Sequence, residues 1–218
     1  MALQLDHVFI LTTPGAPAAD RLLELGWVEG NANRHPGQGT SNRRFFLPDF
    51  TVELLFISDA DEAAQGAGNG LRLLARSQDD KACPFGVVVR VADGESAPDF
   101  PAWQYVPDYF DGKMCFYVGD NSDRLEEPLC ICMPPSLPQR SPVPEKYQNP
   151  TWNLHRLDIS LPIETPSVVL QQFAAMDKVN IVYGEAPRMT LNFNKGAANV
   201  MIDLSPELPL VINHQRFS

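Results

Sequence analysis

The 218-residue sequence has no cluster of lysine and arginine residues, and its formal net charge is −10. Proteins that bind a nucleic-acid backbone or an anionic membrane need grouped basic side chains, so we expect neither kind of partner. The apolar runs have the length of strands, and none approaches the roughly 20 residues of a transmembrane helix. The opening segment MALQLDHVFI lacks the basic and long apolar stretches of a secretory signal. These absences predict a cytoplasmic protein.

Several motifs of catalysis and cofactor binding are also missing. The loop HPGQGT does not continue into the GK[ST] of a phosphate-binding loop, which argues against nucleotide binding. There is no GxSxG nucleophile elbow and no local cysteine–histidine signature, so covalent catalysis is not expected. The four cysteines are Cys83, Cys115, Cys130 and Cys132. They form no CxxC pair, and we expect free buried thiols rather than a metal or redox site.

What the sequence does contain is enough apolar material for a real core. Hydrophobic residues make up 44% of the chain and charged residues 20%, which is typical of a globular protein with one large domain or two small ones. LQLDHVFILTT alternates like a strand, and APAADRLLELGW has the spacing of a short amphipathic helix. SNRRFFLP and FTVELLFIS, joined by PDF, predict a hairpin. With WVEG as a brief strand, the order is β-α-β-β-β.

The same order of elements is predicted at the far end of the chain. LHRLDISLP predicts a strand, TPSVVLQQFAAM a helix with Thr165 as N-cap, and three further strands and a tail strand follow. The middle contains the strands CPFGVVVRVAD, KMCFYVGD and PLCICMPP, but its Pro-rich linking segment cannot hold a useful helix. We therefore expect a single region built of three units, at about 4–58, 83–134 (helix lost) and 153–213.

LDHVFI, followed by a helix and then by HPGQGTSNRRFFLPDFTVELLFIS, resembles the vicinal oxygen chelate superfamily. In particular it is similar to the glyoxalase-like branch, which includes glyoxalases, bleomycin-resistance proteins and extradiol dioxygenases. The resemblance covers most of the chain and is specific over residues 5–57. It implies an α+β fold in which repeated βαβββ units form curled mixed sheets around a central pocket, with helices outside. In superfamily enzymes the pocket holds a divalent metal bound by the first and last strands of each unit.

Strand alternation brings two polar side chains toward such a pocket. In LDHVFI it places His7 on the face opposite Val8 and Ile10, and in TVELLFI it places Glu53 opposite Val52. If the helix covers Val8 and Ile10, His7 points to the concave side, and Glu53 can do the same. A buried carboxylate must be paired, hydrogen-bonded or bound to a metal. Glu53 is therefore expected to be held by an arginine (Arg43, Arg44 or Arg156) or to bind a metal. Without such a partner it would act as a general base, which burial would favour by raising its pKa.

A metal site needs more than these two ligands, because catalytic zinc takes three protein ligands and nickel, manganese or iron(II) takes a wider shell. In the middle unit, the position that corresponds to His7 is Gly86, and the one that corresponds to Glu53 lies in LCICM. Neither supplies a ligand. Zinc, nickel, manganese and iron(II) are the candidate ions, and a metal-free site is the alternative.

The last unit offers His155 or Arg156 at its first-strand position and Met201 or Asp203 at its last-strand position. If the first and last units pair, the full metal set would be His7, Glu53, His155 and Asp203. If Arg156 faces inward instead, an ion pair with Glu53 would replace the metal.

Loops that lead into the sheet rim the pocket, according to the resemblance. The residues expected to orient a polar ligand are His35, Gln38, Asn42, Arg44 and Arg156. Arg43 and Arg44 alternate, so only one can face inward, and an inward arginine favours a carboxylate-bearing ligand.

Two functions follow for a protein that binds a small oxygen-bearing molecule. The first is a metal-assisted isomerase or lyase that uses Glu53, with dioxygenase chemistry less favoured. The alternative is a metal-free protein that sequesters a small molecule, as bleomycin-resistance relatives do. The resemblance also allows a homodimer, because such units pair between chains as well as within one.

Overall fold

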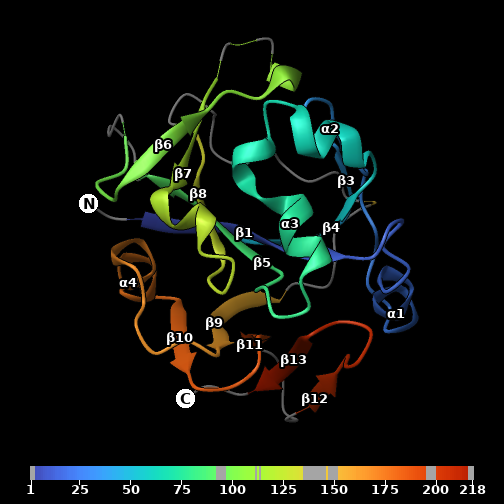
Figure 1. Cartoon of the computed structure of the whole chain (residues 1–218). Helices are drawn as coiled ribbons and strands as arrows, with labels where there is room; N and C mark the ends of the chain where they lie inside the picture. The colour runs from blue at the N-terminus through green and yellow to red at the C-terminus, as the bar shows by residue number, and fades with distance from the viewer. Residues whose placement is uncertain are drawn as a thin grey trace.

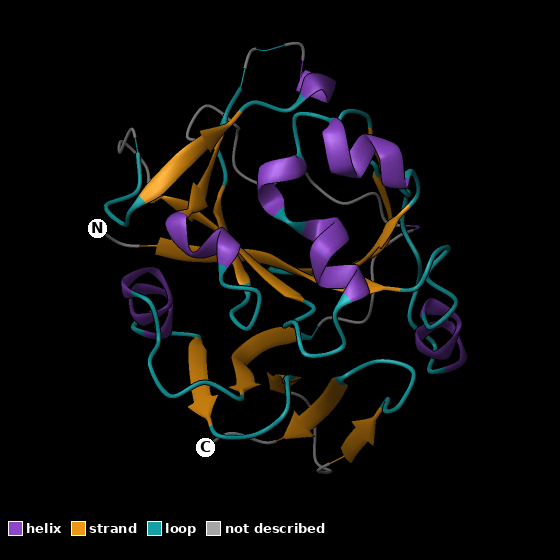
Figure 2. Ribbon diagram, viewed as in Figure 1, coloured by secondary structure: helices purple, strands orange, loops and turns teal. Residues whose placement is uncertain are grey.

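The computed structural model describes residues 3–91, 97–110, 112, 114–134, 146, 152–194 and 200–215. It contains two mixed β-sheets and a few short helices, so the fold is α+β as expected (Figures 1 and 2). The first sheet has the strand order β2-β3-β4-β1-β5-β8-β7-β6 and curls into a half-barrel. The second has the order β10-β9-β11-β13-β12.

The strands of the first sheet are β1 (Leu3–Thr12), β2 (Arg34–His35), β3 (Thr40–Phe46), β4 (Thr51–Ile57), β5 (Phe85–Val91), β6 (Ala102–Tyr105), β7 (Phe116–Gly119) and β8 (Leu129–Cys132). Those of the second are β9 (Asn153–Leu161), β10 (Val179–Tyr183), β11 (Arg188–Asn194), β12 (Val200–Asp203) and β13 (Leu210–Gln215). The helices are α1 (Ala19–Glu24), α2 (Ala60–Gln65), α3 (Leu73–Gln78) and α4 (Val168–Ala174), with 3₁₀ turns η1 (Asn69–Leu71), η2 (Asp108–Phe110) and η3 (Asp120–Asp123).

The first and middle units of the sequence share the first sheet. β1 pairs in parallel with β4, β5 pairs in parallel with β8, and β1 and β5 join the two halves in antiparallel fashion. Among the described residues, no helix lies between β5 and β6. Each half thus runs outward from a central first strand through its own last strand. This is the paired arrangement that the resemblance to the vicinal oxygen chelate superfamily implies.

The last part of the chain keeps the order of elements but pairs them differently. β9 lies parallel to β10, the strand that follows α4, and antiparallel to β11. In the first unit, by contrast, β1 pairs with β4, the last strand of the unit. The second sheet therefore does not repeat the pairing of the first.

The main core lies between the two sheets, which are stacked in Figure 1 with the second sheet below the first. Val8 and Ile10 of β1 pack in one buried cluster with Leu157 and Ile159 of β9. Leu22 of α1 belongs to the same cluster, as the spacing of the helix predicts. One face of the first sheet is thus filled by the second sheet and by α1.

The opposite, concave face has a second and smaller core. Phe9 and Leu55 from the strands pack there with Leu71 and Leu73 from the η1–α3 segment. The η1–α3 segment therefore covers part of the concave face and α2 packs against this segment, whereas α1 and α4 lie outside the sheets (Figure 1). No element was expected between β4 and β5, although Asp59 accepts a hydrogen bond from the Glu62 backbone N–H as the N-cap of α2.

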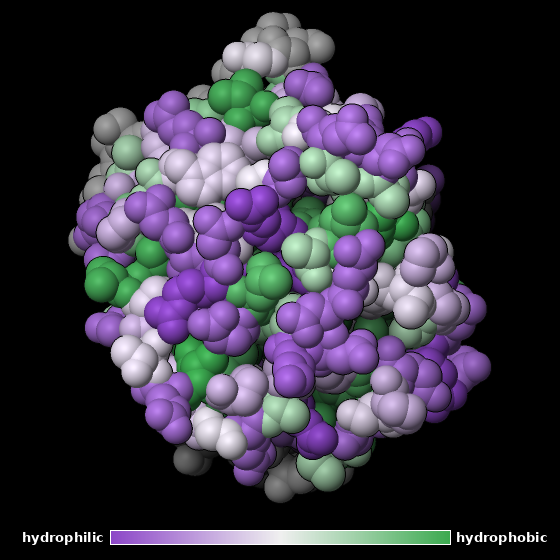
Figure 3. Space-filling view, viewed as in Figure 1, coloured by the Kyte–Doolittle hydropathy of each residue, from purple (hydrophilic) through white to green (hydrophobic). Residues whose placement is uncertain are grey.

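Helix α4 forms where the sequence predicts it, but its cap differs. Ser167, rather than Thr165, is the N-cap, and its Oγ accepts a hydrogen bond from the Leu170 N–H at 3.0 Å. Buried Glu127 fixes Ser167 by accepting from both its backbone N–H and its hydroxyl. This contact from another unit decides the cap position. In the part of the chain that the structure describes, no helix could cross a membrane. The face drawn in Figure 3 is largely polar, with hydrophobic residues in small groups.

The close approach of β1 and β5 predicts the effect of one substitution. A Cβ atom at Gly86 would lie 2.0 Å from the Phe9 ring. We expect Gly86→Ala to reduce the free energy of unfolding by about 1–3 kcal/mol, measured by urea denaturation, because the ring must leave its place. Combining it with Phe9→Leu should cost less than the sum of the two single changes. An unfolding midpoint like that of the parent for Gly86→Ala would contradict this contact.

Candidate functional site

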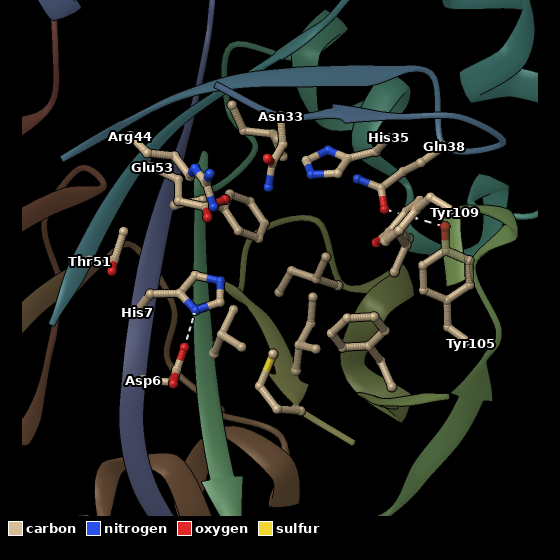
Figure 4. A pocket seen from close by; sticks show the side chains of 18 of the residues that line it. Asp6, His7, Asn33, His35, Gln38, Arg44, Thr51, Glu53, Tyr105 and Tyr109 are labelled. Atoms are coloured by element: carbon tan, nitrogen blue, oxygen red, sulfur yellow. Dashed lines mark hydrogen bonds and ion pairs between the residues drawn. The ribbon is translucent and has the colours of Figure 1, made fainter. Parts of the chain in front are cut away.

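A cavity of about 590 Å³ lies on the concave face of the first sheet. Its size is that of a pocket for a small molecule. Both units of the sheet line it, together with Leu71, Leu73 and the aromatic residues of η2. Figure 4 shows the labelled polar side chains arranged around its open centre.

Glu53 and His7 both line this cavity from neighbouring strands. Glu53 lies opposite Phe9 of β1 on one side and opposite Arg44 of β3 on the other. Its Oε2 accepts a hydrogen bond of 3.0 Å from Asn42 Nδ2. The carboxylate therefore lies at the edge of the cavity. Asn42 binds one of its oxygens, and solvent in the cavity can hydrate the other.

Asn42 holds Glu53 from behind rather than lining the cavity. Its side chain is 1% exposed, and its Oδ1 accepts a hydrogen bond of 2.7 Å from the Asn33 backbone N–H. Donor and acceptor of the amide are thereby both used. The geometry gives Asn42 a positioning role, in place of the ligand contact that we expected from the sequence.

His7 has a carboxylate partner that strand alternation did not reveal. The pairing of β1 with β5 shifts register between Leu5 and His7, so Asp6 and His7 both line the cavity. Asp6 Oδ1 lies 2.6 Å from His7 Nδ1, and its other oxygen pairs with Arg90. Burial alone would raise the pKa of Asp6, but its bonds to His7 and Arg90 hold that pKa well below the usual range. Because the carboxylate accepts from Nδ1, the Nε2 of His7 is left for the cavity.

A network of neutral polar groups forms the next part of the wall. His35 Nδ1 lies 2.9 Å from Thr40 Oγ1, which also accepts a 2.7 Å hydrogen bond from Gln38 Nε2. The Tyr105 hydroxyl donates to Gln38 Oε1 at 3.3 Å, and the Tyr109 ring lies 5.3 Å from the ring of His35. Burial lowers the pKa of His35 and raises those of both tyrosines, so all three are uncharged at neutral pH. His35, Gln38 and both tyrosines line the cavity.

Of the two adjacent arginines, Arg44 lines the cavity and Arg43 lies on the other face. Arg43 is paired with Glu29 at 2.6 Å and Asp20 at 2.9 Å, so it has no role in the site. Arg44 donates from Nε to the Asn31 carbonyl at 2.6 Å, and its Cζ lies 4.9 Å from the centre of the Phe46 ring. Burial lowers the pKa of Arg44, while nearby Glu53 opposes that shift.

The wall supplied by the strands of the middle unit is mostly apolar. Its cavity-lining residues from β5, β7, β8 and the residue after β8 are Val88, Phe116, Leu129, Ile131 and Met133, together with one charged residue, Arg90 of β5, which is paired with Asp6. These positions include the strands from which the resemblance implies a second pair of metal ligands. The cavity is therefore polar on the side of the first unit and mostly apolar along β5 and β8 of the middle unit.

The residues expected from the last unit do not reach the cavity. His155, Arg156 and Asp203 lie in the second sheet and are exposed. Arg156 pairs with Asp158 at 2.9 Å, and Asp203 lies 3.6 Å from Arg188. The second sheet packs on the opposite face of the first, so neither the four-ligand set nor an Arg156–Glu53 pair can form. Across the described residues, no three His, Cys, Asp or Glu side chains are grouped as a metal site.

Among known proteins, only solved structures are similar to this chain in the three comparisons. No family model matches the chain, and no curated protein does. A hypothetical protein from Staphylococcus aureus is similar over 100% of both chains, with a TM-score of 0.60 and 12% identity. Methylmalonyl-CoA epimerase from Mycobacterium tuberculosis aligns with 62% of this chain and 89% of its own, with a TM-score of 0.41 and 12% identity. The full-length match shows a shared fold.

The lowered pKa of Asp6 predicts how stability depends on pH. Its pair contributes fully above the unfolded pKa of about 3.9 and is lost as pH falls toward the lower folded value. We expect Asp6→Asn to reduce the free energy of unfolding by about 1–3 kcal/mol at neutral pH, because His7 and Arg90 lose a charged partner. Urea denaturation at a series of pH values should show a shallower acid loss for the variant than for the parent. Asp123→Asn, at a largely exposed ion pair, is the control, and equal acid profiles for Asp6→Asn and the parent would refute the assignment.

Proposed function

We propose that the cavity binds a small amphipathic molecule, with an oxygen-bearing polar end and an apolar body, and needs no resident metal. The division of the cavity into two walls carries this proposal. Most of the charged and hydrogen-bonding groups come from the first unit, whereas β5 and β8 of the middle unit contribute mainly apolar side chains, among them Val88, Leu129 and Ile131. A ligand with one polar and one apolar end would satisfy both walls, because each buried group would meet a partner of its own kind.

The donor set does not fit the metal that the superfamily resemblance implies. A catalytic zinc site usually takes three protein ligands. Four side chains of suitable type line the cavity (Asp6, His7, His35 and Glu53), but no three such side chains among the described residues are grouped as a metal site. Asp6 is held by His7 and Arg90, and His35 Nδ1 lies at hydrogen-bond distance from Thr40. Apolar side chains such as Val88 and Ile131 occupy the middle-unit wall where further ligands would have to come from. This favours metal-free binding over the metal-assisted chemistry that the sequence also allowed.

Metal analysis tests this proposal. We expect untagged protein, purified and then equilibrated with zinc, nickel, manganese or iron(II), to retain no stoichiometric ion after desalting. Glu53→Gln and His7→Ala should have the same metal content as the parent, measured by plasma mass spectrometry. One ion per chain in the parent, lost in both variants, would overturn the metal-free proposal.

A second candidate function is proton transfer by Glu53 within the same cavity. One carboxylate oxygen is fixed by Asn42, while the described residues give Oε1 no hydrogen bond, which leaves it able to take a proton. For a bound keto acid, Glu53 would remove a proton from the carbon beside the carbonyl, and the electron pair would move to the carbonyl oxygen. Arg44 would stabilise the resulting enolate. Return of the proton to oxygen gives the enol isomer, and its return to carbon regenerates the keto acid.

Deuterium uptake by phenylpyruvate in heavy water, followed by NMR, checks this candidate. We expect the parent to accelerate exchange beyond the buffer rate, and Glu53→Gln to reduce the acceleration by about 100-fold or more. Glu24→Gln, an exposed acid of α1, is the matched control and should exchange like the parent. If the parent only equals buffer, Glu53 is not a base for this type of substrate.

A further inference from the structure

The Arg44 side chain is held in place as a cation, but the described residues supply no anion at ion-pair distance from it. The Asn31 carbonyl and the Phe46 ring fix the guanidinium from Nε and from one face. Among the described residues, its Nη atoms have no hydrogen-bond partner and no carboxylate lies at ion-pair distance. A half-buried guanidinium with unused donors is costly, and a carboxylate can accept two parallel hydrogen bonds from it.

Glu53 lies directly opposite Arg44 in the β3–β4 ladder, and both side chains reach the cavity (Figure 4). No ion pair joins the two side chains, although Glu53 acts to raise the pKa of Arg44 against the lowering effect of burial. Glu53 Oε2 is occupied by Asn42, so Oε1 can accept a hydrogen bond from a ligand. A molecule that satisfies both residues needs a carboxylate for Arg44 and, on the adjacent carbon, a donor for Glu53.

The net charge of the cavity-lining residues indicates which donor group the ligand carries. Three arginines line the cavity (Arg34, Arg44 and Arg90) against two acids (Asp6 and Glu53), which gives +1 with the histidines counted as neutral. This positive cavity belongs to a chain with a net charge of −10. It suits a monoanion better than a zwitterion, so a neutral hydroxyl is favoured over an ammonium group.

On these grounds, and resting on the small-molecule binding proposed above, we propose that the ligand is an α-hydroxy acid with an apolar substituent. Its carboxylate binds Arg44, its hydroxyl donates to Glu53, and its substituent packs against Val88 and Ile131. The cavity of about 590 Å³ leaves room for an aromatic or branched substituent.

Four probes that share a benzyl group separate these contributions. Phenyllactate has both polar groups, hydrocinnamate lacks the hydroxyl, phenyllactamide lacks the charge, and phenylalanine replaces the hydroxyl by an ammonium group. We expect phenyllactate to bind most tightly, and loss of either polar group to weaken binding about tenfold, as measured by calorimetry or ligand-observed NMR.

Variants of the two polar residues test the assignment directly. Arg44→Gln should weaken phenyllactate binding about tenfold or more and leave phenyllactamide almost unchanged. Glu53→Gln should weaken phenyllactate more than hydrocinnamate. Arg43→Gln is the matched control, because the neighbouring arginine lies on the other face; once circular dichroism shows that it is folded, it should bind phenyllactate like the parent.

The possible failures are distinguishable. If phenyllactamide binds as tightly as phenyllactate, or if Arg44→Gln has no effect, the ligand class is wrong while the proposed small-molecule function stands. If phenylalanine binds most tightly, the assignment of the hydroxyl is wrong. If none of the four probes binds up to its solubility limit, both the ligand class and the proposed function are overturned.

Discussion

The antiparallel pairing of β1 with β5 is the interaction on which the rest of the structure depends. It joins two units into one continuous sheet, one face of which packs in the main core while the other lines the cavity. Val8 and its partner Val87 face the second sheet and the main core, whereas Val88, the partner of His7, faces the cavity. If β1 shifted by one residue in this pairing, the side chains on its two faces would change places, and His7 would be buried in the apolar core. The core and the cavity are therefore specified by the same pairing.

The polar wall is held in place by the protein before any ligand arrives. Asp6 lies between His7 and Arg90, and Asn42 holds Glu53 through an amide that is itself fixed by the Asn33 backbone. Such support reduces the loss of conformational entropy on ligand binding, since the side chains are already oriented. It also explains how several charges are tolerated on the concave face of a hydrophobic sheet, because each is paired, hydrogen-bonded or adjacent to the cavity.

The fold and half of the site could be predicted from local sequence patterns. Alternation in two strands correctly placed His7 and Glu53 on the cavity side, because strand geometry is local. The resemblance also gave the α+β architecture, but it left open which units pair. His155 and Asp203 were misplaced because the choice of neighbouring strands is set by the whole chain, and the second sheet has a pairing of its own. Asp6 was missed for a related reason, since the register shift that turns it inward appears only when β1 meets β5.

The chemistry of the cavity follows from an asymmetry between two halves with the same strand pairing. The first unit places an acid on its last strand, beside an arginine, while the middle unit places Leu129 and Ile131 on the corresponding strand. Had both halves carried acids, the cavity would gather ligands around a cation, since facing carboxylates repel without one. Because the middle unit contributes no acid, Glu53 instead has a neighbouring cation, Arg44, and a mostly apolar wall across the cavity. The proposed ligand, with one polar and one apolar end, would bind in one orientation, because reversing it would bury its charge against hydrocarbon.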